Sequence, residues 1–220
     1  MKKGIIFDMD GTLWDSAEGV VKAWNEVIEP LPDKDHLVTL DEMYSLMGKP
    51  MDEIAALVFP NLEKERREEV MDVCCERENV YLAEKGGILY PKLEETLQAL
   101  QKEYDLFIVS NCQVGYIEAF LEHYGFGHFF RDTENFGNTG KLKDENIRLV
   151  IERNGLKQAA YVGDTKGDYQ SCIQAGVPFI YASYGFGDVK DPKYSIGQFA
   201  DLPDVVHCVM KNLSSFDKQG

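Results

Sequence analysis

Four short apolar runs stand out along the chain, and each has the length of a buried β-strand. They cover residues 4–8, 106–110, 159–163 and 178–182, with the sequences GIIFD, LFIVS, AAYVG and PFIYA. A continuous apolar run of this length, bounded by turn-forming residues, is typical of a strand that is covered on both faces. The pattern therefore predicts four strands in the interior of one sheet.

Longer stretches with helical periodicity alternate with these runs. They cover residues 92–104, 115–125, 145–155 and 168–176, and three of the four end at a glycine, as a helix with a C-terminal cap does. Strands and helices in alternation favour an α/β fold with a doubly wound, mostly parallel sheet.

Residues 16–83 interrupt this alternation. They contain several helical patterns and almost no β-branched run that resembles a strand. The simplest interpretation is a small helical bundle inserted after the first strand, with residues 1–15 and 84–220 forming the core. Such an insert would lie above the carboxyl ends of the strands, where open α/β sheets bind their ligands.

Charge and composition narrow the function classes. The 220 residues carry a formal net charge of -15, which argues against general binding to nucleic acid or to an anionic membrane. No stretch approaches the roughly 20 apolar residues of a membrane span, and the first ten residues reach acidic side chains too early for a secretory signal. The five cysteines are odd in number and form no CxxC pair, which fits reduced thiols. We expect a cytoplasmic protein.

Polar side chains follow the predicted strands at their carboxyl ends. Asp8 and Asp10 follow the first strand, and the later strand ends carry Ser110 with Asn111 and Asp164 with Asp168. Two interpretations of the first pair are open: the acids solvate an ordinary turn, or a turn brings both carboxylates to one site, where they suit a metal or a phosphoryl group. The acids and the hydroxyl at successive strand ends, together with nearby lysines, favour the second.

The ordered set of motifs resembles the haloacid dehalogenase superfamily of aspartate-nucleophile phosphohydrolases. DMDGTLWDS (8–16) resembles its DxDGT motif, VSN (109–111) its hydroxyl motif and GDTKGD (163–168) its GDxxxD motif, and the helical insert resembles its helical cap. The resemblance covers essentially the whole chain and implies a Rossmann-like core. It also implies Mg²⁺-dependent hydrolysis of a small phosphorylated metabolite, of the phosphoglycolate phosphatase kind. The dehalogenase branch lacks the second acid of the first motif, so Asp10 points to phosphoryl transfer.

The resemblance also implies a role for each site residue. Asp8 would attack phosphorus to form an aspartyl phosphate, and Asp10 would act as general acid and then as general base. Mg²⁺, which prefers oxygen ligands, would be held by Asp8, the backbone carbonyl of Asp10 and Asp164, with Asp168 in support. The expected phosphate-binding residues are Gly11, Thr12, Ser110 and Asn111.

Two features of the motif set are open. Lys141 and Lys143 in TGKLKDENI both lie where the family has its motif lysine, and the proline-rich turn that usually follows that lysine is missing. A count from the helix end selects Lys141, whereas the KDENI phrase selects Lys143. Lys49 in the insert resembles a cap loop that reaches the substrate, but it also fits a solvated surface lysine.

Two other functions are compatible with the sequence. A sugar phosphomutase of the β-phosphoglucomutase type shares every core motif, and a non-catalytic phosphometabolite sensor or partner-binding protein could keep the same fold. Retention of both Asp8 and Asp10 argues against the sensor. We expect a monomer or a weak homodimer.

Overall fold

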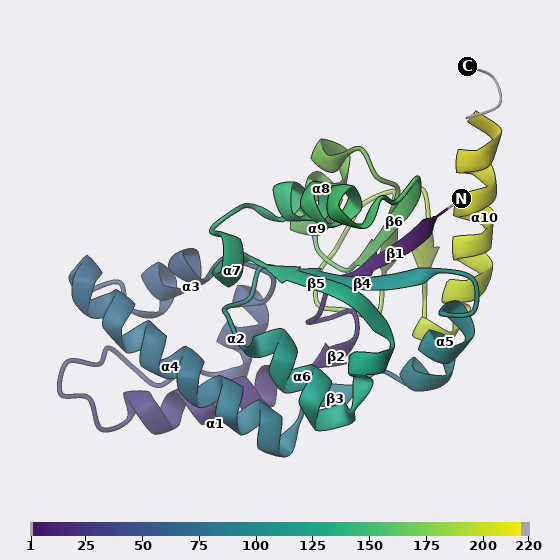
Figure 1. Ribbon diagram of the computed structural model, residues 1–220. Helices are drawn as coiled ribbons and strands as arrows, with labels where there is room; N and C mark the ends of the chain where they lie inside the picture. Colours follow the sequence, from purple (N-terminus) through teal and green to yellow (C-terminus); the bar gives the residue numbers. More distant parts are fainter. Residues whose placement is uncertain (1, 217–220) are drawn as a thin grey trace.

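The computed structural model describes residues 2–216 and shows a Rossmann-like core with a helical insert (Figure 1). Six parallel strands form one sheet in the order β5-β4-β1-β6-β7-β8. The strands are β1 (Lys3–Phe7), β4 (Asp105–Ser110), β5 (Phe130–Asn135), β6 (Gln158–Gly163), β7 (Phe179–Ala182) and β8 (Ser195–Ile196). The predicted doubly wound parallel sheet is confirmed.

Helices cover both faces of the sheet. They are α5 (Leu93–Leu100), α6 (Tyr116–Tyr124), α7 (Phe136–Thr139), α8 (Lys143–Asn154), α9 (Lys166–Ala175) and α10 (Leu202–Phe216), with 3₁₀ turns at Phe126–His128 and Phe199–Asp201. Successive side chains of β1 alternate between two cores: Ile6 packs with α8 residues, whereas Ile5 and Phe7 pack with α10 residues. Both faces of the strand are therefore apolar, as the run at 4–8 predicts.

Four helices lie between the first strand and the rest of the core. They are α1 (Ala17–Ile28), α2 (Leu40–Leu46), α3 (Met51–Val58) and α4 (Lys64–Lys85), and α1 packs along α4 (Figure 1). The chain enters and leaves this insert through a two-stranded sheet of β2 (Trp14–Asp15) and β3 (Ile88–Leu89). Helix α4 packs against α6, and its buried side chains continue the larger core. The insert therefore packs directly against the core, in addition to being connected to it through the chain.

Two strands of the sheet were not predicted. Edge strand β5 has the sequence FRDTEN, and its acids Asp132 and Glu134 each lie 2.6 Å from the Arg153 guanidinium. Ion pairing at a sheet edge replaces the apolar run on which the prediction depended. Strand β8 spans only Ser195–Ile196 and carries no periodic signal.

No helix among residues 2–216 is long and apolar enough to cross a bilayer.

Candidate active site

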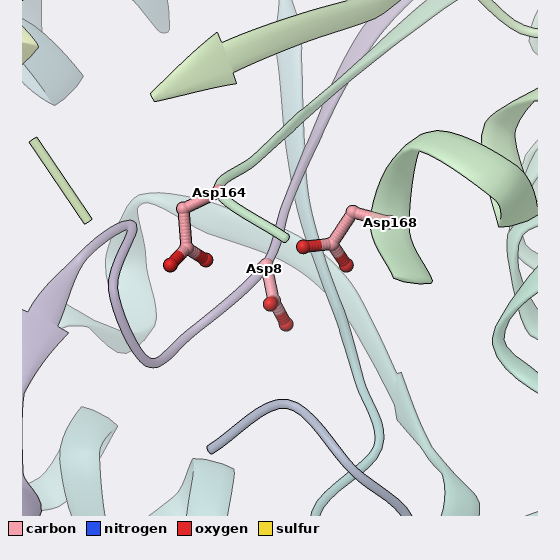
Figure 2. A group of neighbouring side chains, drawn as sticks. All are labelled: Asp8, Asp164 and Asp168. Carbon is pink, nitrogen blue, oxygen red and sulfur yellow. The ribbon is translucent and has the colours of Figure 1, made fainter. Parts of the chain in front are cut away.

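Three buried carboxylates meet at the carboxyl ends of the central strands. Asp8 follows β1, Asp164 follows β6, and Asp168 lies in the first turn of α9. One oxygen atom of each side chain lies within 4.8 Å of the others, and Figure 2 shows the three side chains close together. Strands β1 and β6 are neighbours in the parallel sheet, so their ends bring distant parts of the chain to one point.

Lys143 is the cation of this cluster. Its Nζ atom lies 3.0 Å from Asp8 Oδ1 and 2.6 Å from Asp168 Oδ1, and its side chain is 3% exposed. Burial alone lowers the pKa of Lys143, but Asp168 and Asp8 outweigh it and raise that pKa well above the ordinary value. Lys141 instead lies exposed in the loop before α8. Of the two candidate lysines, only Lys143 is brought to Asp8.

Asp168 has no free oxygen atom in this arrangement. Its Oδ2 atom accepts hydrogen bonds from the Thr165 backbone N–H at 2.9 Å and the Thr165 hydroxyl at 2.7 Å, which completes a capping box at the start of α9. Its Oδ1 atom accepts the Lys143 hydrogen bond. Burial raises the pKa of Asp168, but Lys143 and Thr165 outweigh it and hold that pKa below the usual value. Asp168 is therefore a fixed anion that holds Lys143 in position.

Asp164 is held by a loop that the motif analysis did not identify. Its Oδ2 atom accepts hydrogen bonds from the backbone N–H groups of Phe186 at 2.7 Å and Gly187 at 3.3 Å. Gly11, with φ of +78°, leaves room for it, because a Cβ atom there would lie 2.1 Å from Asp164 Oδ2. The Oδ1 atom is buried and has no hydrogen-bond partner among the described residues. One buried oxygen of a carboxylate in the cluster is therefore left without a hydrogen-bond partner among the described residues.

Lys143 alone does not balance the charge of the three carboxylates when all three are ionised. Burial and, after it, the nearby charge of Asp168 raise the pKa of Asp8 to about 7, against the opposing effect of Lys143. Burial likewise raises the pKa of Asp164 well above its usual value, and Asp168 and Asp8 add to the shift. Three carboxylates share a single lysine, so their ionised state lacks a counter-charge. The unsatisfied oxygen of Asp164 and this charge imbalance both fit a divalent cation with oxygen ligands, such as Mg²⁺.

Asp10 is not part of the three-carboxylate cluster found among the described residues. The chain bends after Asp8, and the Leu13 N–H donates to the Met9 carbonyl at 2.8 Å. Asp10 Oδ1 accepts hydrogen bonds of 2.6 Å from the Ser16 hydroxyl and 2.6 Å from the Tyr116 hydroxyl. Burial raises the pKa of Asp10, opposed by these two hydrogen bonds. The two acids of the first motif thus have different partners, although both line the same cavity.

The other predicted site residues divide into two groups. Ser110 and Asn111 line the cavity, and the Asn111 side-chain amide donates to the Gly48 carbonyl of the insert at 2.9 Å. Lys49 lines it too, but its Nζ atom is paired with Glu53 Oε1 at 2.5 Å. Thr12 is fully buried, and its hydroxyl has no hydrogen-bond partner among residues 2–216. The structure does not bring the Thr12 side chain to the cavity.

The cavity lies between the insert and the core and has a volume of about 40 Å³. The core contributes Asp8, Asp10 and the 110–113 loop. The insert contributes an apolar wall of Val20, Trp24, Met43, Leu46, Met47, Met51 and Ile54. One buried acid, Glu78 of α4, interrupts this wall.

Sequence reasoning missed several residues that shape the site. Thr165 was not predicted, although it precedes the predicted Asp168 by three residues, which is the spacing of a capping box and could have identified it. Ser16 precedes the first helix of the insert, a typical N-cap position. Tyr116 and Glu78 come from helices whose patterns are merely amphipathic or charged. No local signal in the sequence distinguishes these two residues.

Comparisons with known proteins show the family and the fold of the chain. A family model described as haloacid dehalogenase-like hydrolase matches residues 5–182. The phosphoglycolate phosphatase of Escherichia coli strain K12 is 27% identical, over 96% of this chain and 90% of that protein. A predicted phosphatase from Clostridium acetobutylicum has a TM-score of 0.77 at 24% identity, covering 94% of this chain and 99% of that one. A predicted phosphoglycolate phosphatase from Haemophilus somnus has a TM-score of 0.78 at 23% identity, covering 93% and 98%.

Proposed function

The chain belongs to the haloacid dehalogenase-like hydrolases and is a phosphatase of that superfamily, and on this premise we propose that it hydrolyses a small phosphate monoester through an aspartyl phosphate on Asp8. The observation that carries the proposal is the placement of Asp8 at the end of β1, 3.0 Å from the buried Lys143 ammonium and beside a cavity. A nucleophile and a charge stabiliser are thereby held together where a substrate can reach them.

Asp8 is the proposed nucleophile. Attack by a carboxylate on a phosphate dianion is opposed by like charge, so the site needs positive charge around both groups. Lys143 provides one such charge at Asp8 Oδ1, and Asp168 keeps its ammonium in place. The carboxylate of Asp8 forms a bond to phosphorus as the ester oxygen leaves.

Asp10 is the proposed proton donor and acceptor. Its raised pKa favours a protonated carboxyl group, which can give its proton to the departing ester oxygen. Hydrogen bonds from Ser16 and Tyr116 hold this carboxyl group, which lines the cavity. Once deprotonated, Asp10 can take a proton from the water that attacks the aspartyl phosphate. Two carboxylates in different environments thus divide the two kinds of chemistry.

The proposed metal is Mg²⁺, and Asp8, Asp164 and the backbone carbonyl of Asp10 would hold it. Asp164 has the unsatisfied Oδ1 atom that such a ligand needs. When bound, the cation neutralises the charge of the phosphoryl oxygens and of the surrounding carboxylates. Asp168 would act through Lys143, because both of its oxygen atoms already accept hydrogen bonds.

The helical insert is the proposed cap, spanning residues 16–83. It forms one wall of the cavity, and the contact of Asn111 with Gly48 joins it to the phosphate-binding loop of the core. A cap that closes over the site excludes bulk water and favours small substrates. Ser110 and Asn111 would donate hydrogen bonds to the phosphate. The relative from Escherichia coli, named for phosphoglycolate, also fits a small substrate.

Release of phosphate from p-nitrophenyl phosphate tests the proposal. We expect turnover with added Mg²⁺ and loss of activity in excess chelator, because the buried carboxylates repel a phosphate dianion without a cation. Restoring Mg²⁺ after chelation should restore the rate. Full turnover by protein shown to be metal-free would contradict the metal assignment. No turnover of any ester, with Mg²⁺ present, would favour a sensor, and an isomerised sugar phosphate without free phosphate would favour a mutase.

A further inference from the structure

Glu78 is a buried acid on the insert side of the cavity, and the mechanism above does not use it. Its residue is 4% exposed and lines the cavity together with Asp8 and Asp10. The Trp24 indole N–H donates a 2.5 Å hydrogen bond to Glu78 Oε2, and the Gln113 side chain is its other stabilising neighbour. Among the described residues, no lysine, arginine or histidine is paired with it. A buried acid kept without a cationic partner requires an explanation.

The charges around the cavity show what a substrate would meet. Asp8, Asp10 and Glu78 line it, and Lys49 is the one cationic side chain in its lining among residues 2–216. Lys49 is already paired with Glu53 and is 36% exposed at its side chain. Lys143 is committed to Asp8 and Asp168. Beyond the position proposed for the phosphate, the cavity therefore offers hydrogen-bond acceptors and apolar surface, and none of the described residues that line it is an unpaired cation.

We propose that Glu78 determines which phosphate esters the site accepts. The preferred esters carry a hydrogen-bond donor, either a hydroxyl or an ammonium, on their alcohol part. Esters that carry a carboxylate there are rejected. This inference rests on the proposed phosphatase function. A donor group would satisfy the Glu78 carboxyl group in the apolar wall, whereas a carboxylate would face a second acid in a poorly solvated space. The preference would differ from the substrate in the name of the Escherichia coli relative.

Three two-carbon esters form a matched test, because they differ only in the terminal group. These are 2-aminoethyl phosphate, 2-hydroxyethyl phosphate and phosphoglycolate, assayed with Mg²⁺ on the full-length protein. We expect kcat/KM for at least one of the two donor esters to exceed that for phosphoglycolate by ~10-fold or more, the scale of one unpaired polar group in a buried site. If only 2-aminoethyl phosphate has the higher kcat/KM, the site prefers an ammonium group. If both donor esters have similar, higher values, the preferred interaction is a hydrogen bond that a hydroxyl group can also donate.

The isosteric variant Glu78→Gln tests whether this residue causes the preference. In assays of all three esters at pH 9, above the pKa of about 8 to which burial raises Glu78, the variant keeps the size and an acceptor oxygen but removes the charge, so the preference over phosphoglycolate should shrink by several-fold, most strongly for the amine. Glu76→Gln, an exposed glutamate on the same helix, should leave all three rates unchanged. The preference of the wild-type protein tests the inference even if Glu78→Gln folds poorly.

The failures of the two proposals are distinguishable. If p-nitrophenyl phosphate is hydrolysed but phosphoglycolate is the best of the three esters, the specificity inference is wrong and the phosphatase function stands. The same holds if Glu78→Gln changes all three rates by one common factor. If no ester is hydrolysed, p-nitrophenyl phosphate included, both proposals fall.

Discussion

The core side and the insert side of the cavity differ in the kinds of side chain that form them. On the core side, Asp8, Asp168 and Lys143 are buried and joined by short ion pairs at the ends of parallel strands. On the insert side, the wall is apolar and contains one buried acid, Glu78, bonded to an indole N–H. The core side is a dense set of buried charges whose carboxylates could hold a metal ion, and the insert side has little charge of its own.

This difference assigns two tasks to two parts of the chain. The ends of β1 and β6 position the proposed nucleophile Asp8 and the neighbouring carboxylate of Asp164 in the sheet, so changes there should affect the rate with every substrate. The insert contributes the surface that the alcohol part of the substrate would contact, so changes there should depend on the substrate. Variants on either side can test this division, and they follow in order of expected effect.

Removing the lysine of the core side should have the largest effect. We expect Lys143→Ala to lower kcat by at least ~100-fold with every ester, because one charge stabiliser of the transition state is lost. Lys141→Ala is the matched control, since Lys141 lies exposed two residues earlier, and its effect should be small. Steady-state kinetics on both variants decide the matter. The reverse order would transfer the motif role to Lys141, and small effects of both would remove the lysine from the mechanism.

Glu78, the buried acid on the insert side, should make the stability of the protein depend on pH. Burial raises the pKa of Glu78 from 4.5 to about 8 in the folded protein. Because the folded pKa is the higher one, the contribution of this group to stability is fully present below pH 4.5 and is lost as the pH rises through about 8. Glu78→Gln, which cannot ionise, should gain ~1–3 kcal/mol relative to the wild type between pH 5 and pH 8.5.

Urea unfolding of both proteins in chelator, at the two pH values, measures this gain. Glu76→Gln should show no such pH-dependent difference, because Glu76 is exposed. An equal difference between Glu78→Gln and the wild type at both pH values would mean that Glu78 titrates in the folded protein much as it does in the unfolded chain.

Lys49 should give the smallest effect and the one most dependent on substrate. It lines the cavity but is partly exposed and paired with Glu53, so its charge is partly screened. We expect Lys49→Ala to change KM for a charged metabolite ester by ~3-fold to 10-fold while changing KM for p-nitrophenyl phosphate less. Equal changes for the two substrates would make Lys49 a surface residue without a role in specificity.

The fold and the core side of the site were largely predictable from local patterns. The apolar runs identified β1, β4, β6 and β7, because buried parallel strands need continuous apolar sequence. The carboxyl ends of such strands share one edge, which brought Asp8 and Asp164 together as expected. Strand β5 was not predicted, because its acidic side chains form ion pairs with Arg153 and its sequence lacks a continuous apolar run.

The details of the site depend on contacts between distant parts of the chain, which no local pattern shows. The spacing in TGKLKDENI allows either Lys141 or Lys143 as the motif lysine, although the KDENI phrase favours Lys143, and only the folded chain shows the contact of Lys143 with Asp8. Glu78 lies in a charged stretch of α4 that resembles a solvated helix face. Its burial follows from the packing of α4 against α1 and α6, which the sequence of α4 alone does not reveal.

The covalent intermediate tests the central claim most directly, the division of labour between Asp8 and Asp10. The Asp10→Ala variant keeps the nucleophile but lacks the proposed base, so with acetyl phosphate or p-nitrophenyl phosphate, whose leaving groups need little protonation, phosphoenzyme should accumulate. Mass spectrometry of rapidly acid-quenched protein should show one phosphoryl group on the peptide that carries Asp8. The Asp8→Asn variant should show none. A phosphoryl group on Asp10 of the wild-type protein, or near-normal turnover by Asp8→Asn, would contradict the account.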